Sequence, residues 1–362
     1  MSDTLTQARQ LLEAQDFEKA LELLNQVNPI TPTVKSSVAR ALSGLGRWDE
    51  AHSLFTEALA DDPQCHEGLA GRGLLYFFTG QFNKAVKDYS EAIGLDPSNG
   101  RYRGLRGVLL GQAGDAPNAL KDLEKAYELG DHDPSYILCR AQLLLATRQV
   151  PQAEEVLQLA EKHNADQAAL SSLEGALSML KGNAKEALAS YRFAVEKSPQ
   201  VSDNWMNLLA LTARLERSRL TEEVTRALKA HPDNEEFITL AVGAMIEEGK
   251  TKEAFGLLRD ALKRNPESPL LQFQMGMGLA NAGKFEKAAE HFSKALELRP
   301  RFPRALDARG NCLEKLGKKK EAQADFEESH RIRTEDAERQ AQQQAEAVAS
   351  QEASTNSEDE QV

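Results

Sequence analysis

Residues 66–99 read HEGLAGRGLLYFFTGQFNKAVKDYSEAIGLDPSN, and this stretch decides the fold. Its second half, from Lys84 to Ile93, is amphipathic with a helical period, which is typical of a helix that buries one face. Gly80 precedes that helix and can adopt the positive φ that ends a first helix and turns the chain. Pro97 follows it and cannot continue it. The stretch therefore predicts two helices joined by a tight turn.

The same pattern recurs along most of the chain with a period of 34 residues. If Ala85 is placed at slot 20 of a 34-residue unit, alanine recurs at slots 20 and 27 and glycine at slots 8 and 15. A large apolar or aromatic residue occupies slot 24, and proline occupies slot 32 of five units. Small residues at slots 8, 20 and 27 predict where two helices approach closely, and the large residue at slot 24 fills the space beside them. The slot-20 alanines are Ala51, Ala85, Ala119, Ala153, Ala187, Ala254, Ala288 and Ala322.

These slots resemble those of the tetratricopeptide repeat family, whose 34-residue pattern is W-x₂-L-G-x₂-Y…A-x₃-F…P. Trp205 occupies the tryptophan slot of repeat seven. The resemblance implies an all-α fold, an α-solenoid in which tandem helix–turn–helix units form a right-handed superhelix with the first helix of each unit on the inner face. The residues of repeat three that carry the resemblance are Leu69, Gly73, Tyr76, Ala85, Tyr89, Ala92 and Pro97.

We predict about ten repeats over residues 1–333, followed by an acidic tail. Repeat one is shortened, and repeat seven lacks one residue and has Glu216–Arg219 in place of its turn. A weakened unit opens most easily in a linear stack, so residues 202–232 are a candidate hinge between two sub-arrays. Repeat five has Arg148 where most units have glycine. The predicted repeats are 1–30, 32–65, 66–99, 100–133, 134–167, 168–201, 202–234, 235–268, 269–302 and 303–333.

The tail, residues 334–362, is rich in Gln, Ala and Glu and has eight acidic residues and one arginine, a net charge of −7 out of −12 for the chain. Its composition predicts a helical extension over 335–349 and disorder over 350–362. A chain this acidic disfavours nucleic acid as a partner. No signal-peptide pattern and no apolar run of about 18 residues is present, so we expect a cytoplasmic protein without membrane insertion.

No catalytic or cofactor motif stands out. The segment Gly278–Lys284 imitates a phosphate-binding loop, but Phe285 follows where Ser or Thr would hold Mg²⁺, and a helix is expected before it. The seven histidines lack the spacing of metal ligands, and the three cysteines form no disulfide framework. We therefore expect no cofactor, no metal and no enzyme activity.

Partner binding is expected on the inner face, where the resemblance places slots 2, 5, 6 and 9 of each first helix. Slots 5, 6 and 9 of repeats three to nine contain no charged residue. Such a strip suits an amphipathic helix or an extended apolar segment, or it packs between neighbouring first helices instead. The candidate partner-binding residues are Leu74, Arg101, Leu105, Val108, Leu138, Gln142, Leu173, Met206, Asn207, Leu240, Phe273 and Met277.

Some relatives bind the acidic tails of chaperones through a clamp of Lys, Asn and Arg side chains. Repeats two to four have Ser36 and Arg40, Gly71, and Arg101 and Leu105 at the corresponding slots, so this clamp is not found. We expect a scaffold or adaptor that binds a partner protein or peptide in its groove. A self-associating array or an accessory subunit of a larger assembly is the alternative.

Two further expectations concern packing. Arginine at slot 7 coincides with aspartate at slot 23 in repeats three, four and ten, which predicts an ion pair between the two helices of each unit. Trp48 and Trp205 are both expected in the repeat core. The predicted pairs are Arg72–Asp88, Arg106–Asp122 and Arg309–Asp325.

Overall fold

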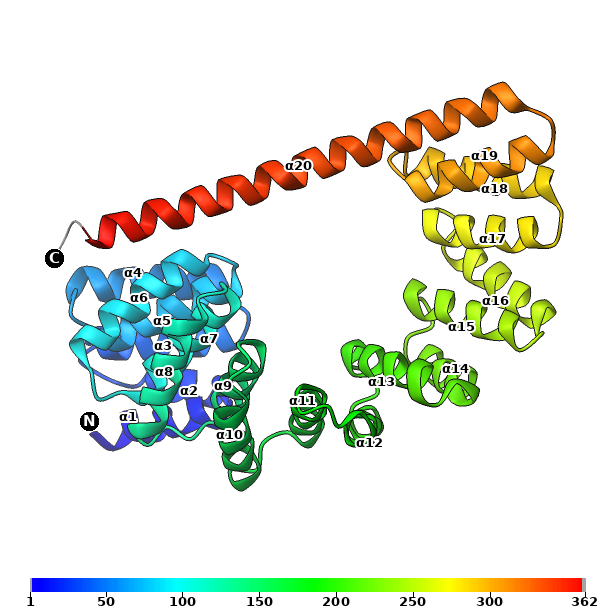
Figure 1. The fold of residues 1–362 in the computed structure, drawn as a ribbon. Coiled ribbons are helices and arrows are strands. Elements are labelled where there is room, and N and C mark those ends of the chain that lie inside the picture. Colours follow the sequence, from blue (N-terminus) through cyan, green and yellow to red (C-terminus); the bar gives the residue numbers. More distant parts are fainter. Residues whose placement is uncertain (1, 360–362) are drawn as a thin grey trace. The chain divides into compact units, whose positions relative to one another are not determined.

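The computed structural model describes residues 2–359, which divide between Ser198 and Pro199 into two compact units (Figure 1). Every regular element among these residues is a helix. Successive helices form antiparallel pairs joined by short turns. The all-α solenoid fold is confirmed. The hinge expected over residues 202–232 stays a prediction, and those residues belong to the second unit.

The first unit contains six helix pairs, and each pair is one repeat. Within a repeat the first helix packs on the second, and the second packs on the first helix of the next repeat. The helices are α1 (Ser2–Glu13), α2 (Phe17–Leu24), α3 (Pro32–Gly44), α4 (Trp48–Asp61), α5 (His66–Phe78), α6 (Phe82–Leu95), α7 (Gly100–Gln112), α8 (Ala116–Glu128), α9 (Pro134–Ala146), α10 (Val150–Lys162), α11 (Gln167–Leu180) and α12 (Ala184–Lys197).

The second unit contains four further pairs. A short 3₁₀ helix, Arg217–Arg219, takes the place of the glycine turn in repeat seven. The helices are α13 (Ser202–Leu215), α14 (Leu220–Ala230), α15 (Glu235–Glu247), α16 (Thr251–Arg264), α17 (Pro269–Asn281), α18 (Phe285–Leu298), α19 (Pro303–Lys315) and α20 (Lys319–Asp359).

Helix α20 is the longest helix of the second unit and extends well beyond α19 in Figure 1. Arg301 holds its extension through Glu335 and Asp336, at 2.7 and 2.6 Å. The helix continues to Asp359, whereas the sequence predicts disorder from Ser350; alanine, glutamine and glutamate favour helix even without a core to pack on. Residues 360–362 lie outside the described residues. No helix within 2–359 has the length and apolarity to cross a bilayer.

The core follows the slots. The slot-20 alanines are almost fully buried, and the slot-24 side chains Phe55, Tyr89 and Phe292 are at most 1% exposed. The aromatic ring at slot 24 also explains the glycine at slot 8, because a Cβ on Gly276 would lie 2.6 Å from the ring of Phe292. Helices therefore approach closely where the sequence predicts.

The turn between the two helices of a repeat requires a positive φ at slot 15. Glycine provides it in seven repeats, with φ from 72° at Gly80 to 86° at Gly114. Repeats one and five keep the same conformation without glycine, with φ of 59° at Gln15 and 58° at Arg148. The departure seen at Arg148 thus leaves the turn intact and places a side chain in a conformation that costs free energy.

Repeats four and five end their second helix without proline. Gly130 and Asn164 have positive φ, 88° and 56°, one residue before the slot that proline occupies elsewhere. The amides of Asp131 and Ala165 then donate to the carbonyls of Ala126 and Ala160, at 3.1 and 3.0 Å. This is the hydrogen bond of a Schellman cap, which replaces proline as the helix stop.

The three predicted Arg–Asp pairs are all present and bidentate. Arg72 donates to Asp88 at 2.7 and 2.8 Å, and Asp88 is only 3% exposed. The Arg106–Asp122 pair has distances of 2.6 and 2.8 Å, and the Arg309–Asp325 pair 2.8 and 2.7 Å. These pairs therefore lock the first helix of a repeat onto the second.

Two of these arginines also reach backwards. Arg106 donates to Ser90 at 2.9 Å and Arg309 to Ser293 at 3.0 Å, and each serine lies on the second helix of the preceding repeat. Arg140 of repeat five, which has no aspartate at slot 23, pairs with Glu124 of repeat four at 2.6 Å. The slot-7 arginine therefore joins neighbouring repeats as well as the helices of one repeat.

Candidate peptide-binding groove

A cavity of about 820 Å³ lies against the first helices of repeats one to four, all within the first unit. Helices α3 and α5 pack closely, as do α7 and α9, whereas α5 and α7 make little backbone contact. His66 and Tyr102 bridge that wider gap, with Nδ1 and the hydroxyl 2.9 Å apart. We call this cavity the N-terminal groove. Its main lining residues are Arg9, Leu12, Glu13, Phe17, Ser36, Ser37, Arg40, Trp48, Phe55, His66, Glu67, Ala70, Gly71, Leu74, Phe78, Tyr89, Arg101, Tyr102 and Leu105.

Small residues create the space for aromatic walls. A Cβ on Gly71 would lie 2.3 Å from the ring of Phe55, and one on Gly44 would lie 2.5 Å from Phe17. Both rings thus lie flush against a first helix and form part of the lining. The groove is therefore shaped by the same glycine–aromatic contacts that build the core.

Trp48 and Phe78 form an exposed aromatic pair at this groove. Their ring centroids are 5.9 Å apart, and they are 42% and 63% exposed. Trp205 is buried, 2% exposed, with its indole N–H donating to the Pro199 carbonyl at 2.8 Å. The core prediction is confirmed for Trp205 and wrong for Trp48, which begins α4 and lines the groove formed by the neighbouring repeats.

Charge in the groove is only partly balanced. Arg9 pairs with Glu67 at 3.1 Å. Arg40 is half-buried and takes no part in the hydrogen bonds and ion pairs found among the described residues. Burial lowers the pKa of Arg40, and the positive charges of Arg101 and Arg9 lower it further. The carboxylate of Glu13, which also lines the groove, acts in the opposite direction, as a bound anionic group would.

The floor of the groove contains an unsatisfied hydroxyl. Tyr89 is 1% exposed and lines the cavity, and its hydroxyl has no hydrogen-bond partner among the described residues. Burial raises the pKa of this phenol. A buried polar group without a partner costs free energy that a bound donor or acceptor would recover.

The twelve sequence-predicted residues do not form one strip. Leu74, Arg101 and Leu105 line the N-terminal groove. Leu138 and Leu173 pack against the core of repeats five and six, and Phe273 is 3% exposed against Phe292 and Phe302. For Phe273 the expectation is wrong, because ring stacking in repeat nine buries it. The remaining candidates are half-buried or exposed outside the groove: Val108, Gln142, Met206, Asn207, Leu240 and Met277.

The sequence missed repeats one and two as part of the site. Arg9 and Arg40 break the uncharged pattern of slots 5, 6 and 9, and that break was the available signal. Trp48 had no such signal, because its exposure depends on how the neighbouring repeats stack.

Tetratricopeptide repeat family models match four segments of the chain, residues 39–79, 66–99, 269–302 and 303–335. Two of these segments have the bounds of predicted repeats three and nine, and the remaining repeats keep the same slots and helix pairs. The chain is a tetratricopeptide repeat protein. Repeats of this kind build extended surfaces that serve as interaction scaffolds and as subunits of assemblies.

One relative and two solved structures illustrate the similarity. Over 101 residues the chain is 35% identical to a peroxisomal targeting signal receptor of Kluyveromyces lactis, a match that covers 26% of this chain and only 17% of that receptor. The structure of Pseudomonas aeruginosa pilF is 18% identical with a TM-score of 0.51 and covers 59% of this chain and 96% of its own. The structure of MamA is 19% identical with a TM-score of 0.39, and the match covers 45% of this chain and 96% of the MamA chain. At this identity the pilF structure shows the fold alone.

Proposed function

We propose that the protein is a non-catalytic interaction scaffold whose N-terminal groove binds an extended peptide with a carboxylate beside an apolar side chain. The observation that supports this most is Arg40, a half-buried arginine that forms no ion pair with the described residues and lies in a cavity lined by aromatic rings. The similar segment of a targeting signal receptor agrees with peptide recognition.

Each part of such a peptide has a counterpart in the groove. A carboxylate would hydrogen-bond to Arg40 with Arg101 nearby, and charge-assisted bonds of this kind are about twice as strong as neutral ones. An apolar side chain would pack on Trp48 and Phe78, since buried aromatic side chains dominate the energetics of interfaces. The unpaired hydroxyl of Tyr89 would accept a hydrogen bond from a peptide N–H or donate one to a peptide carbonyl. Together these contacts would pair the charge of Arg40, cover the exposed rings of Trp48 and Phe78, and satisfy the buried hydroxyl of Tyr89.

The test is selection from a random peptide display library on the full chain. The selected peptides are then titrated against Arg40→Gln, Arg101→Gln and the control Lys87→Gln, which makes the same charge change at a lysine that is 76% exposed outside the groove. We expect acidic peptides with an aromatic or aliphatic anchor, and about tenfold weaker binding to the Arg40 variant.

The control variant should bind like the unchanged protein. Selected peptides that lack acidic residues, or that bind all variants equally, would contradict the assignment of the groove. In sedimentation, a monomer at all concentrations agrees with an adaptor, whereas species that grow with concentration would favour the self-associating array.

A cytoplasmic setting belongs to the same proposal. Cys65, Cys139 and Cys312 are free thiols, and Cys65 and Cys312 are buried. Free thiols are typical of reducing compartments. If the protein were found to be secreted with any of these cysteines oxidised or chemically modified, the cytoplasmic part of the proposal would be contradicted.

A further inference from the structure

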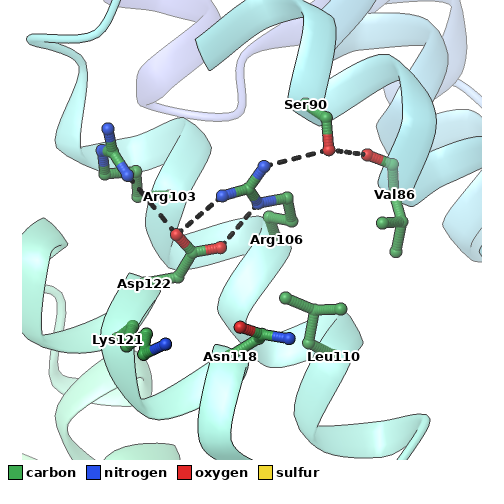
Figure 2. Close-up of a pocket in the computed structure, with 8 residues that line it drawn as sticks. All are labelled: Val86, Ser90, Arg103, Arg106, Leu110, Asn118, Lys121 and Asp122. Atoms are coloured by element: carbon green, nitrogen blue, oxygen red, sulfur yellow. Dashed lines mark hydrogen bonds and ion pairs between the residues drawn. The ribbon is translucent and has the colours of Figure 1, made fainter. Parts of the chain in front are cut away.

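A second cavity, of about 450 Å³, lies between α6, α7 and α8 of the first unit and shares no residue with the N-terminal groove (Figure 2). Figure 2 shows Arg103 and Arg106 around Asp122, with Lys121 and Asn118 on the same helix as the aspartate. Three cations and one carboxylate therefore line a small polar cavity, which we call the Arg103 pocket.

The carboxylate of Asp122 in this pocket already has hydrogen-bond donors on both oxygens. Both oxygens of Asp122 accept from Arg106, at 2.6 and 2.8 Å, and the third guanidinium nitrogen of Arg106 donates to Ser90 at 2.9 Å. The equivalent pairs Arg72–Asp88 and Arg309–Asp325 reach the same bidentate geometry with one arginine each. Asp122 needs no further partner, so the charge of Arg103 is surplus.

Arg103 has an unusual position in the repeat. It stands at slot 4, where repeats three and ten have Leu69 and Leu306 in the core. Its closest anionic contact is a long one, 3.5 Å to Asp122, and its Nε is buried without a hydrogen-bond partner among the described residues. The side chain is only 22% exposed, so water cannot fully replace the missing partner.

Repeat two shows how a cation at this slot is otherwise balanced. Lys35 occupies slot 4 there and pairs with Asp61 at 2.7 Å and with Glu57 at 3.5 Å. The corresponding slots of repeat four hold Leu129 and Lys125. The counter-ions that balance Lys35 are therefore replaced around Arg103 by an apolar residue and by another cation.

We propose that the Arg103 pocket binds a phosphate group, with Arg103 and Lys121 as its principal donors. Lys121 is exposed and takes no part in the hydrogen bonds and ion pairs of the described residues. With Asp122 balanced by Arg106, the pocket has two uncompensated positive charges, which match the charge of −1.5 to −2 that a phosphate monoester carries at neutral pH. A carboxylate would leave one of them uncompensated. The planar guanidinium of Arg103 suits bidentate binding of phosphate oxygens.

The test is calorimetric titration of the full chain, in phosphate-free buffer at constant ionic strength, with inorganic phosphate and separately with O-phospho-L-serine. Arg103→Leu restores the side chain that other repeats place at this slot and should keep the fold. We expect it to weaken binding about 10- to 100-fold, and Lys121→Gln to weaken it about threefold. Lys263→Gln, the same charge change at a lysine that is 77% exposed in the second unit, should bind like the unchanged protein.

The two probes distinguish the source of the phosphate. Tighter binding of phosphoserine supports a phosphorylated side chain of a partner, and tighter binding of inorganic phosphate supports the free anion. No heat of binding with either probe at 50 mM, or equal affinity in Arg103→Leu and the unchanged protein, would overturn the proposal.

Discussion

The positive φ at Arg148 makes the turn of repeat five a place where one substitution should stabilise the protein. Arg148→Gly removes an exposed side chain that takes no part in the hydrogen bonds and ion pairs of the described residues, so its effect comes from the backbone alone. Gly114→Ala provides the opposite change at the same slot of repeat four, where φ is 86° and nothing lies within 4 Å of an added Cβ.

The magnitude follows from two opposing terms. A residue with a side chain pays about 1–2 kcal/mol in the left-handed conformation. Glycine avoids that strain but loses about 0.5–1 kcal/mol more conformational entropy on folding. Arg148→Gly should therefore stabilise the folded state by about 0.5–1 kcal/mol, and Gly114→Ala should destabilise it by about the same amount.

Hydrogen exchange measured by mass spectrometry is the suitable assay, because repeats open locally and a global midpoint averages over the array. Amides of α9 and α10 should exchange about two- to fivefold more slowly in Arg148→Gly, and those of α7 and α8 faster in Gly114→Ala. Slower exchange should be confined to the repeats next to the substitution. Faster exchange of α9 and α10 in Arg148→Gly would refute the reasoning, since it would mean that the arginine side chain contributes more than the strain costs.

Three further outcomes follow from contacts in the structure. Asp88→Ala should lower the free energy of unfolding by about 2–4 kcal/mol, because it leaves Arg72 without its carboxylate. The double variant Arg72→Met, Asp88→Leu should come close to the original stability in urea denaturation. If the single and double variants lost equal stability, the ion pair itself would be stabilising. Gly104→Ala should destabilise the protein by about 1–3 kcal/mol, since the added Cβ would lie 2.2 Å from the ring of Tyr136. Gly94→Ala, where the added Cβ would enter open space on α6, should stabilise the protein slightly. Thermal melts that rank the two variants the other way would contradict this account of the helix packing. Burial lowers the pKa of His291, so the unfolded chain binds more protons below pH 6.5 and stability should fall there; His291→Gln should flatten this pH dependence of the melting midpoint and the exposed His330→Gln should not.

The sequence predicts most of the fold because each repeat repeats the same local choices. The glycine of slot 15, the alanine of slot 20 and the ring of slot 24 act within one helix pair, so Gly80, Ala85 and Tyr89 are sufficient to define it. The Arg–Asp pairs were predictable for the same reason, because both partners lie in one repeat. Even the substitutes for proline, Gly130 and Asn164, carried a readable signal as helix-ending residues.

The site was less predictable, because it depends on the spacing between repeats. Whether a first-helix side chain packs or faces a cavity is decided by how closely the next first helix approaches, and this differs between α3–α5 and α5–α7. Both Leu105 and Leu173, at the same slot two repeats apart, are half-buried against a core cluster, but only Leu105 also lines the groove. No single repeat contains the information that separates these two leucines.

The slot-7 arginines also constrain how the repeats can change in length over evolution. Arg106 and Arg309 are each 16 residues from an aspartate ahead and 16 residues from a serine behind, so an insertion or deletion in either adjoining turn would separate a buried pair. Repeats one and seven, whose starts are not 34 residues from the start of the next repeat, have Gln7 and Leu208 at that slot. Length variation is therefore expected to accumulate in repeats without the arginine, and new loops are best engineered there.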